Sequence, residues 1–254
     1  MITTLTPPVE ELSADAVAER VFTASLAGLE ALSVYIGDRL GWYRSLREDG
    51  PATPGELSER TGTHPRYARE WLEQQAVMGL LHAEPASSAE ERRYLLPAGA
   101  AEALTDGDSL AYPAPLPRML AAIGRQLPEL LDAYRSGDGV SWDELGADAR
   151  ESQADLNRPW FLQSAGRPPG RAGGGDGRGG RRGVHRTRDD VERFMYAVSL
   201  FICLPDGMSS TPSAGTGTVM RPATLAGYAE NAGFAAVDVL PIPDFSFFRF
   251  YRLR

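Results

Sequence analysis

Residues that could do acid–base, nucleophilic or metal chemistry are few and scattered in this sequence. His64 is placed to cap a helix, His82 to lie in a wing, and His185 in a glycine-rich stretch, so no two histidines pair as ligands or as a base with its orienting partner. Cys203 is the single cysteine, whereas a zinc site needs several cysteine or histidine ligands. No serine stands in the strand–turn–helix context of a nucleophile elbow. We therefore assign no catalytic residue and no metal site.

The glycine-rich run Gly173–Gly177 invites comparison with a nucleotide-binding turn. A glycine loop binds a cofactor only when a strand before it and a helix after it hold its amide groups in place. No apolar strand pattern precedes this run, and no helical pattern follows it. We therefore assign no cofactor-binding residue.

The glycine-rich run belongs to a longer Gly/Arg/Pro-rich segment, Ala165–Arg188, which we call the seam. It contains nine glycines, and seven arginines against one aspartate. Glycine and proline oppose regular elements and arginine prefers water, so the segment cannot bury enough apolar surface to offset the entropy cost of ordering it. We predict that the seam is disordered and separates two folded parts of the chain.

The composition indicates an acidic globular protein. The chain has 254 residues, 43% of them hydrophobic, and a net charge of -8, which argues against broad binding to nucleic acid or anionic lipid because both require positive potential. No apolar run is long enough for a signal peptide or a membrane span. A single cysteine allows no internal disulfide. These features predict a cytoplasmic protein.

A winged helix is predicted over residues 15–104, after a mobile arm over residues 1–14. Apolar residues at helical spacing predict two helices, or one bent helix, over residues 15–46. A capping box, Thr53–Glu56, then starts a short helix.

Gly62 can end this short helix in the left-handed conformation, and Thr63 or His64 can cap a third helix. We expect the inner side of the third helix to carry Tyr67, Trp71, Leu72, Val77 and Met78. Two short apolar runs, 80–82 and 94–96, flank a polar loop and predict the wing.

A winged helix could read DNA through Arg66 and Arg69 of its third helix. Residues 1–100 contain nine arginines and fifteen acidic residues, whereas DNA-binding domains gather positive charge on the docking face. We therefore do not expect nucleic-acid binding. The first helical region has more large apolar residues than a three-helix unit can cover, which predicts a homodimer formed through the N-terminal helices.

The rest of the chain predicts a helical connector over residues 105–164 and an α/β part over residues 189–254. The connector contains an amphipathic helix with its apolar residues over 116–130, in which Pro128 can introduce a kink and which Gly137–Gly139 ends. In the α/β part, Pro205–Gly207 predicts a helix stop, and two alternating runs, 235–240 and 247–253, predict an antiparallel hairpin. The predicted fold class is mainly α with a small β part.

Three pieces of the C-terminal part carry a resemblance to a known family, namely VERFMYAVSLFICLPDGM, TGTVMRPATL and RPATLAGYAENAGF followed by two strands. Together with the winged helix and the connector, they resemble class I S-adenosylmethionine-dependent methyltransferases that carry an N-terminal winged-helix dimerisation domain. The resemblance covers residues 15–163 and 189–253. It implies a Rossmann-like catalytic domain, of which residues 189–254 are a remnant, the cofactor S-adenosylmethionine and a small-molecule methyl acceptor.

In the parent fold of this family, Trp160, Phe161, Met195 and Tyr196 could line an apolar substrate pocket. The alternative is that they are plain core or connector residues. The family's nucleotide-binding half, a strand with a glycine turn and a ribose-binding acid, is missing between them. No cofactor is therefore expected to bind this chain. The methyl acceptor is not identified, because the pocket wall that faces the cofactor is also missing.

Our hypothesis for the origin of the seam is an internal deletion in a longer methyltransferase, with a shifted reading frame that is restored near Asp189. All 26 basic residues are arginine, which suggests a GC-rich genome. When Gly170–Arg188 is written in GC-rich codons and read one nucleotide later, it can give a β-branched run followed by acidic residues. This pattern is typical of a buried parallel strand that ends at an active-site edge.

Three interpretations of function remain open. The first is a methyltransferase-family protein that is truncated through its cofactor site and inactive by itself. The second is a winged-helix transcription regulator. The third is a non-catalytic dimerisation partner of an intact methyltransferase. Cofactor binding separates the first from the others, DNA binding tests the second and co-purification tests the third.

Overall fold

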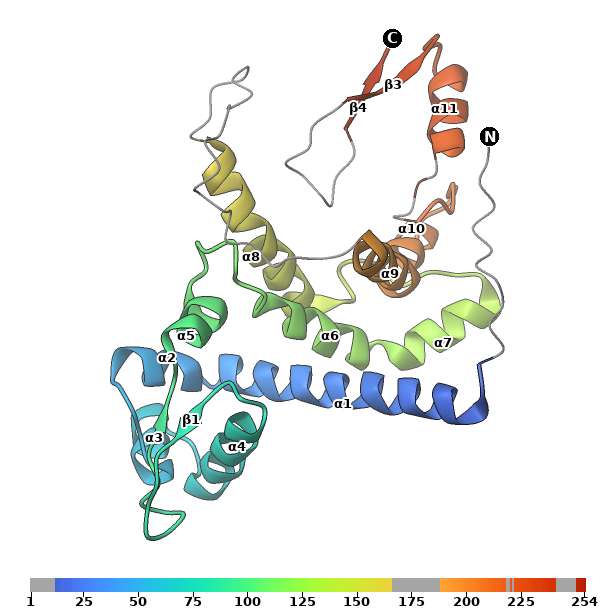
Figure 1. Cartoon of the computed structure of the whole chain (residues 1–254). Helices are drawn as coiled ribbons and strands as arrows, with labels where there is room; N and C mark the ends of the chain where they lie inside the picture. The colour runs from blue at the N-terminus through green and yellow to red at the C-terminus, as the bar shows by residue number, and fades with distance from the viewer. Residues whose placement is uncertain (1–11, 166–187, 218–219, 221, 241–249) are drawn as a thin grey trace. The chain divides into compact units, whose positions relative to one another are not determined.

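The computed structural model describes residues 12–165, 188–217, 220, 222–240 and 250–254. These residues are mainly helical, with two short pairs of antiparallel strands (Figure 1), which confirms the mainly α fold class with a small β part. The chain divides into two units, Met1–Ala121 with Glu151–Arg182 and Ala122–Arg150 with Gly183–Arg254. Most of the predicted mobile arm and of the seam lies outside the described residues.

Two helices open the first unit, one of the two arrangements that the periodicity allows. α1 (Ala14–Arg39) begins after Ser13, whose hydroxyl accepts a hydrogen bond from the amide of Ala16 at 3.2 Å. Gly41 adopts a left-handed conformation with φ 71°, which glycine reaches without steric cost. The chain therefore turns at Gly41, and α2 (Trp42–Glu48) follows.

The helix-turn-helix consists of α3 (Pro54–Thr61) and α4 (Pro65–Val77). The predicted capping box is present: the Glu56 amide donates to the Thr53 hydroxyl at 3.3 Å, and the Thr53 amide donates to the Glu56 carboxylate at 2.8 Å. Gly62 ends α3 in the left-handed conformation with φ 66°. Nδ1 of His64 accepts a hydrogen bond from the Arg66 amide at 3.2 Å, so His64 caps α4 as predicted.

The wing consists of β1 (His82–Ala83) and β2 (Tyr94–Leu95), which pair antiparallel. Tyr94 also bridges to Ala52, just before α3. Its amide donates to the Ala52 carbonyl at 2.9 Å, and the Ala52 amide donates to the Tyr94 carbonyl at 3.2 Å. The wing is thus hydrogen-bonded to the start of the helix-turn-helix, and α5 (Ala98–Thr105) follows it. The predicted winged helix is confirmed.

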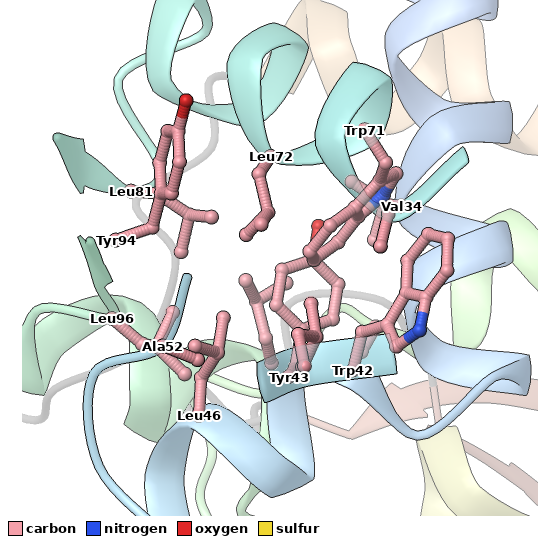
Figure 2. Packing of buried hydrophobic residues seen from close by; sticks show 14 residues of the cluster. Val34, Trp42, Tyr43, Leu46, Ala52, Trp71, Leu72, Leu81, Tyr94 and Leu96 are labelled. Atoms are coloured by element: carbon pink, nitrogen blue, oxygen red, sulfur yellow. The ribbon is translucent and has the colours of Figure 1, made fainter. Parts of the chain in front are cut away.

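The winged-helix core gathers aromatic side chains of α2 and α4 around Trp71 (Figure 2). The ring of Trp71 lies 4.7 Å from that of Trp42 and 4.9 Å from that of Tyr43 between centroids, the second pair edge to face. α1 approaches Trp71 at Gly37, where a Cβ atom would stand 2.2 Å from the indole. The core contains Val34, Trp42, Tyr43, Leu46, Ala52, Leu57, Ala68, Trp71, Leu72, Leu81, Tyr94, Leu96, Leu104 and Ala114.

The inner side of α4 differs from the prediction at two positions. Trp71 and Leu72 are buried, but Tyr67 and Val77 are exposed. The buried stripe of α4 is Ala68, Trp71, Leu72 and Gln75, a spacing of three and four residues that defines one helix face. Tyr67 and Val77 fall outside this face.

A polar network inside this core joins α1, α2 and α4. Gln75 is fully buried, and its amide nitrogen donates to the Ser33 hydroxyl at 2.9 Å. The Tyr43 hydroxyl donates to the Gln75 carbonyl oxygen, and the Trp71 indole N–H donates to the Ser33 carbonyl at 2.9 Å. Burial raises the pKa of Tyr43 well above its ordinary value, so this hydroxyl stays a donor.

The connector contains α6 (Pro115–Arg125), α7 (Leu127–Ser136) and α8 (Gly146–Ala165). The single kinked helix predicted over residues 116–130 is instead two helices, because α6 ends at Arg125 and α7 begins at Leu127. Pro128 lies in the first turn of α7, where the amide that proline lacks has no helical partner to lose.

The C-terminal part of the second unit begins with α9 (Arg188–Val198), the π-helical turn η1 (Ser199–Cys203) and α10 (Leu204–Met208). The helical run ends at Met208, one residue beyond the predicted stop at Pro205–Gly207, so these three residues form part of α10. Proline is accepted in the first turn of a helix, and the Pro205 carbonyl accepts a hydrogen bond from the Val140 amide at 3.1 Å. A small core of Leu130, Ala133 and Val140, with Phe201 packed against it, links α7 to η1.

The chain ends with α11 (Pro222–Asn231), β3 (Val237–Leu240) and β4 (Phe250–Leu253). β3 and β4 pair antiparallel, with Val239 opposite Tyr251, as the predicted hairpin requires. Residues 241–249, which include the beginning of the predicted second strand, lie outside the described residues. Both strand pairs of the described chain are antiparallel, so a Rossmann-like remnant stays a prediction.

Candidate functional site

The third helix of the winged helix carries the two arginines that could contact DNA, and both contact carboxylates. Arg66 forms an ion pair with Glu70 at 2.5 Å. Arg69 forms ion pairs with Glu73 at 3.0 Å, on the next turn of α4, and with Glu90 of the wing loop at 2.7 Å. These carboxylates offset the positive charge that phosphate contacts require.

The four substrate-pocket candidates fall into the two units of the chain. Trp160 and Phe161 lie on α8 in the first unit, where Trp160 is half-buried and Phe161 is 70% exposed. Met195 and Tyr196 lie on α9 in the second unit, half-buried and exposed respectively. Within each unit the two neighbours follow each other along a helix, and a pocket lined by all four stays a prediction.

Cys203 and the two histidines that the structure describes lie on different elements. His64 caps α4, with its ring 5.8 Å from that of Tyr67 between centroids, and His82 is exposed in β1. Cys203 is half-buried in η1, and His185 lies outside the described residues together with Gly173–Gly177. In the described part of the chain, no group of three or more His, Cys, Asp or Glu residues could hold a metal ion.

Membrane insertion by a helix finds no support in the part of the chain that the structure describes. None of its helices combines the length and the apolar character that a membrane crossing requires.

A buried ion cluster that the sequence pattern alone did not reveal joins α1, α6 and α8 in the first unit. Nε of Arg118 donates to one carboxylate oxygen of Asp38 at 2.5 Å and Nη2 to the other at 2.9 Å. Nη1 donates to Asp155 at 2.6 Å. The side chains of Arg118 and Asp38 are only 10% and 8% exposed, and hydrogen bonding to Asp38 raises the pKa of Arg118 further above its ordinary value. The cluster holds helices together rather than performing chemistry.

The helical spacing carries a signal for this cluster. Pro115, Met119 and Ala122 are buried on α6, and Arg118 belongs to the same face by spacing. An arginine on a buried face requires an acidic partner. The pattern does not say which acid serves, because Asp38 and Asp155 are far from Arg118 in the sequence.

An exposed apolar face runs along α1 in the first unit. Phe22 and Leu29 are 65% and 67% exposed. Apart from the adjacent pair Val21 and Phe22, successive members are three or four residues apart, so they lie on one side of the helix. The face consists of Val17, Val21, Phe22, Leu26, Leu29, Leu32 and Ile36.

Residues 28–106 match the family described as the Rv2258c-like winged HTH domain. The match begins within α1 and extends through the helix-turn-helix and the wing to the end of α5. This part of the chain is therefore similar to that domain, in agreement with the winged helix of the structure. No curated protein matches the sequence.

Several solved structures are similar to this chain. Mitomycin 7-O-methyltransferase MmcR is 25% identical, and the alignment covers 60% of this chain and 47% of that one with a TM-score of 0.44. The N,N-8-amino-8-demethyl-D-riboflavin dimethyltransferase RosA from Streptomyces davawensis is 20% identical, over 58% of this chain and 45% of its own, with a TM-score of 0.44.

Human N-acetylserotonin methyltransferase in complex with SAM is 19% identical, over 58% of this chain and 44% of its own, with a TM-score of 0.37. The alignments with these solved structures thus span a little under half of the length of each relative.

Proposed function

We propose that this chain is a relative of the S-adenosylmethionine-dependent methyltransferases of small molecules, that its folded N-terminal part serves as a dimerisation module, and that it does not transfer methyl groups by itself. The observation that carries the proposal is the presence, in one chain, of the winged helix of residues 28–106 and of the C-terminal motifs between residues 191 and 234 that resemble this family.

The inactivity follows from how such enzymes work. Methyl transfer depends largely on holding the sulfonium methyl in line with the acceptor, so catalysis rests on positioning. Positioning needs a glycine turn between a strand and a helix and an acidic residue for the ribose. The strands of the described residues are two antiparallel pairs, and they offer no such turn.

The dimerisation role is supported by the apolar face of α1. A contiguous exposed apolar surface of this kind marks an interaction site, and a helix face that meets a second copy of itself gives a closed, symmetric dimer. A second copy of this chain is the occupant we propose. An intact methyltransferase with the same kind of winged helix is the alternative occupant, and it would make this chain a non-catalytic partner.

The role of transcription regulator has less support. A DNA-binding surface gathers unpaired arginines and lysines, whereas Arg66 and Arg69 contact Glu70, Glu73 and Glu90. Binding of the full chain to random-sequence duplex DNA at low salt would favour the regulator over this proposal.

Titration of the full chain with S-adenosylmethionine in a calorimeter tests the inactivity. We expect no saturable heat, and an intact methyltransferase of the same family serves as the positive control. Saturable binding at micromolar concentration would contradict the proposal and would require a cofactor site that is built without the family's glycine turn.

Sequencing of the gene tests the proposed internal deletion. The proposed division of the chain into a dimerisation domain, a connector, a seam and a C-terminal remnant rests on the same deletion. We expect the shifted frame over Gly170–Arg188 to encode an apolar β-branched run followed by acids. Stop codons or a polar composition in that frame would contradict the deletion.

A further inference from the structure

The part of α8 that belongs to the first unit, residues 151–162, is held there mainly by charged side chains, and we call it the strap. Three ion pairs attach it. Glu151 pairs with Arg39 at 2.8 Å, Asp155 with Arg118 at 2.6 Å and Arg158 with Asp108 at 2.7 Å.

The charged residues of the strap share one helix face. Glu151, Asp155 and Arg158 follow each other at spacings of four and three residues, which places them one above the other on the same side. Their partners come from the end of α1, from α6 and from the loop after α5. The three pairs therefore fasten one side of the strap to three separate parts of the first unit.

The large apolar residues of the strap are exposed or only half-buried. Its two fully or nearly buried residues are Ser152, whose hydroxyl donates to the Pro115 carbonyl at 2.7 Å, and Pro159. Near its end Phe161 is 70% exposed and Leu162 is half exposed, whereas Trp160 is half-buried. An amphipathic helix that is fixed by hydrophobic burial would show the opposite distribution, with its large apolar residues inside.

Arg118 divides its guanidinium between a buried and an accessible partner. Its two hydrogen bonds to Asp38 lie in a buried pair, whereas Asp155 is 41% exposed. The other two pairs of the strap are also open to solvent, because all four of their side chains are at least 31% exposed. Salt screens exposed charge pairs much more than buried ones. Screening should therefore weaken the three strap pairs and leave the Arg118–Asp38 pair in place.

We propose that the strap is a salt-sensitive latch. At low ionic strength it lies on the first unit through Arg39, Arg118 and Asp108, and when its charges are screened or competed for it detaches. The Arg118–Asp38 pair keeps α6 on α1 and the winged-helix core stays folded during this release. A partner with a complementary charge pattern would release the strap in the same way as salt.

Hydrogen exchange of the full chain, followed by mass spectrometry in low salt and in about 1 M NaCl, tests the latch. Because an exposed ion pair changes an equilibrium only a few-fold, loss of three pairs should accelerate exchange of the strap amides roughly tenfold. Exchange of α4 should stay the same. Equal strap exchange at both salt concentrations, or a parallel increase in α4, would overturn the proposal.

Charge variants separate the latch from a general effect of salt. The triple variant Glu151→Gln, Asp155→Asn, Arg158→Gln should exchange rapidly at the strap already in low salt and should lose the salt response. A matched triple variant, Glu70→Gln, Glu73→Gln, Glu90→Gln, removes three exposed ion pairs elsewhere and should keep it. Rapid exchange of the strap amides in the matched variant at low salt would contradict the latch. Exchange of the strap at the natural protein's rate in the first variant would also contradict it.

Discussion

Gly37 shows how a single missing side chain fixes the core of the winged helix. A Cβ atom at this position would stand 2.2 Å from Cζ2 of Trp71 and 2.7 Å from Tyr43. Gly37→Ala should therefore force one of the two rings out of place and destabilise the protein by about 1–3 kcal/mol, the usual cost of overpacking a core. Urea unfolding followed by tryptophan fluorescence measures this loss.

Gly28 in the same helix is the matched control. A Cβ atom there would have no neighbour within 4 Å, so Gly28→Ala should raise the stability by up to about 1 kcal/mol through helix propensity. If both alanine variants had the same stability, the steric account of Gly37 would be wrong.

The start of α3 gives a prediction on the scale of a secondary-structure element. The hydrogen bond from the Thr53 amide, together with Arg93, lowers the pKa of Glu56 below its ordinary value. A lowered pKa in the folded state means that the ionised carboxylate stabilises the fold above the pKa of the unfolded chain. This contribution is lost as the pH falls through the folded pKa.

Glu56→Gln keeps the shape of the capping box but removes the charge. We expect the variant to be slightly less stable than the natural protein at neutral pH, by less than about 1 kcal/mol because the carboxylate is partly exposed. The difference should disappear as the pH falls below about 4. Chemical unfolding followed by circular dichroism over this range measures it, and a difference that does not change with pH would contradict the role of the charge.

Elements whose signals are local could be predicted from the sequence. The capping box at Thr53–Glu56 and the cap at His64 were predictable because their hydrogen bonds join residues two or three positions apart. The places of Pro128 and Pro205 in the first turn of a helix were not. Proline at the start of a helix and proline at its end look alike in a sequence, and only the packing of Val140 and Phe201 against neighbouring helices decides between them.

The candidate site was less predictable than the elements. The pattern pointed to the aromatic residue Phe161, which is exposed on α8, and its expected place in a substrate pocket stays a prediction. The Arg118 cluster was missed because its partners Asp38 and Asp155 come from other helices. For such a long-range pair the sequence pattern reveals only one partner, here Arg118, as a charged residue on an otherwise apolar helix face. The other partner has no recognisable pattern.

On the scale of the whole molecule, the apolar face of α1 predicts the oligomeric state. Light scattering at tens of micromolar should give about twice the 27.5 kDa mass of the chain. Phe22→Glu combined with Leu29→Glu places two charges in the proposed interface, and the mass should fall to that of one chain because burying unpaired charges is costly.

Leu131→Glu serves as the control, because Leu131 is exposed on α7 and lies outside this face. It should leave the dimer intact. A natural protein that is monomeric at the same concentration, or a double variant that remains dimeric, would rule out the proposed interface.

The bridge between Ala52 and Tyr94 bears on the order in which the winged helix folds. The contacts between α3 and α4 join residues that are close in the sequence. The bridge joins residues on either side of the whole helix-turn-helix. Closing such a long loop costs chain entropy before any contact is gained. The helix pair should therefore belong to the folding nucleus, and the wing should dock after the transition state. Removing the Tyr94 ring would then mainly accelerate unfolding and leave the folding rate almost unchanged.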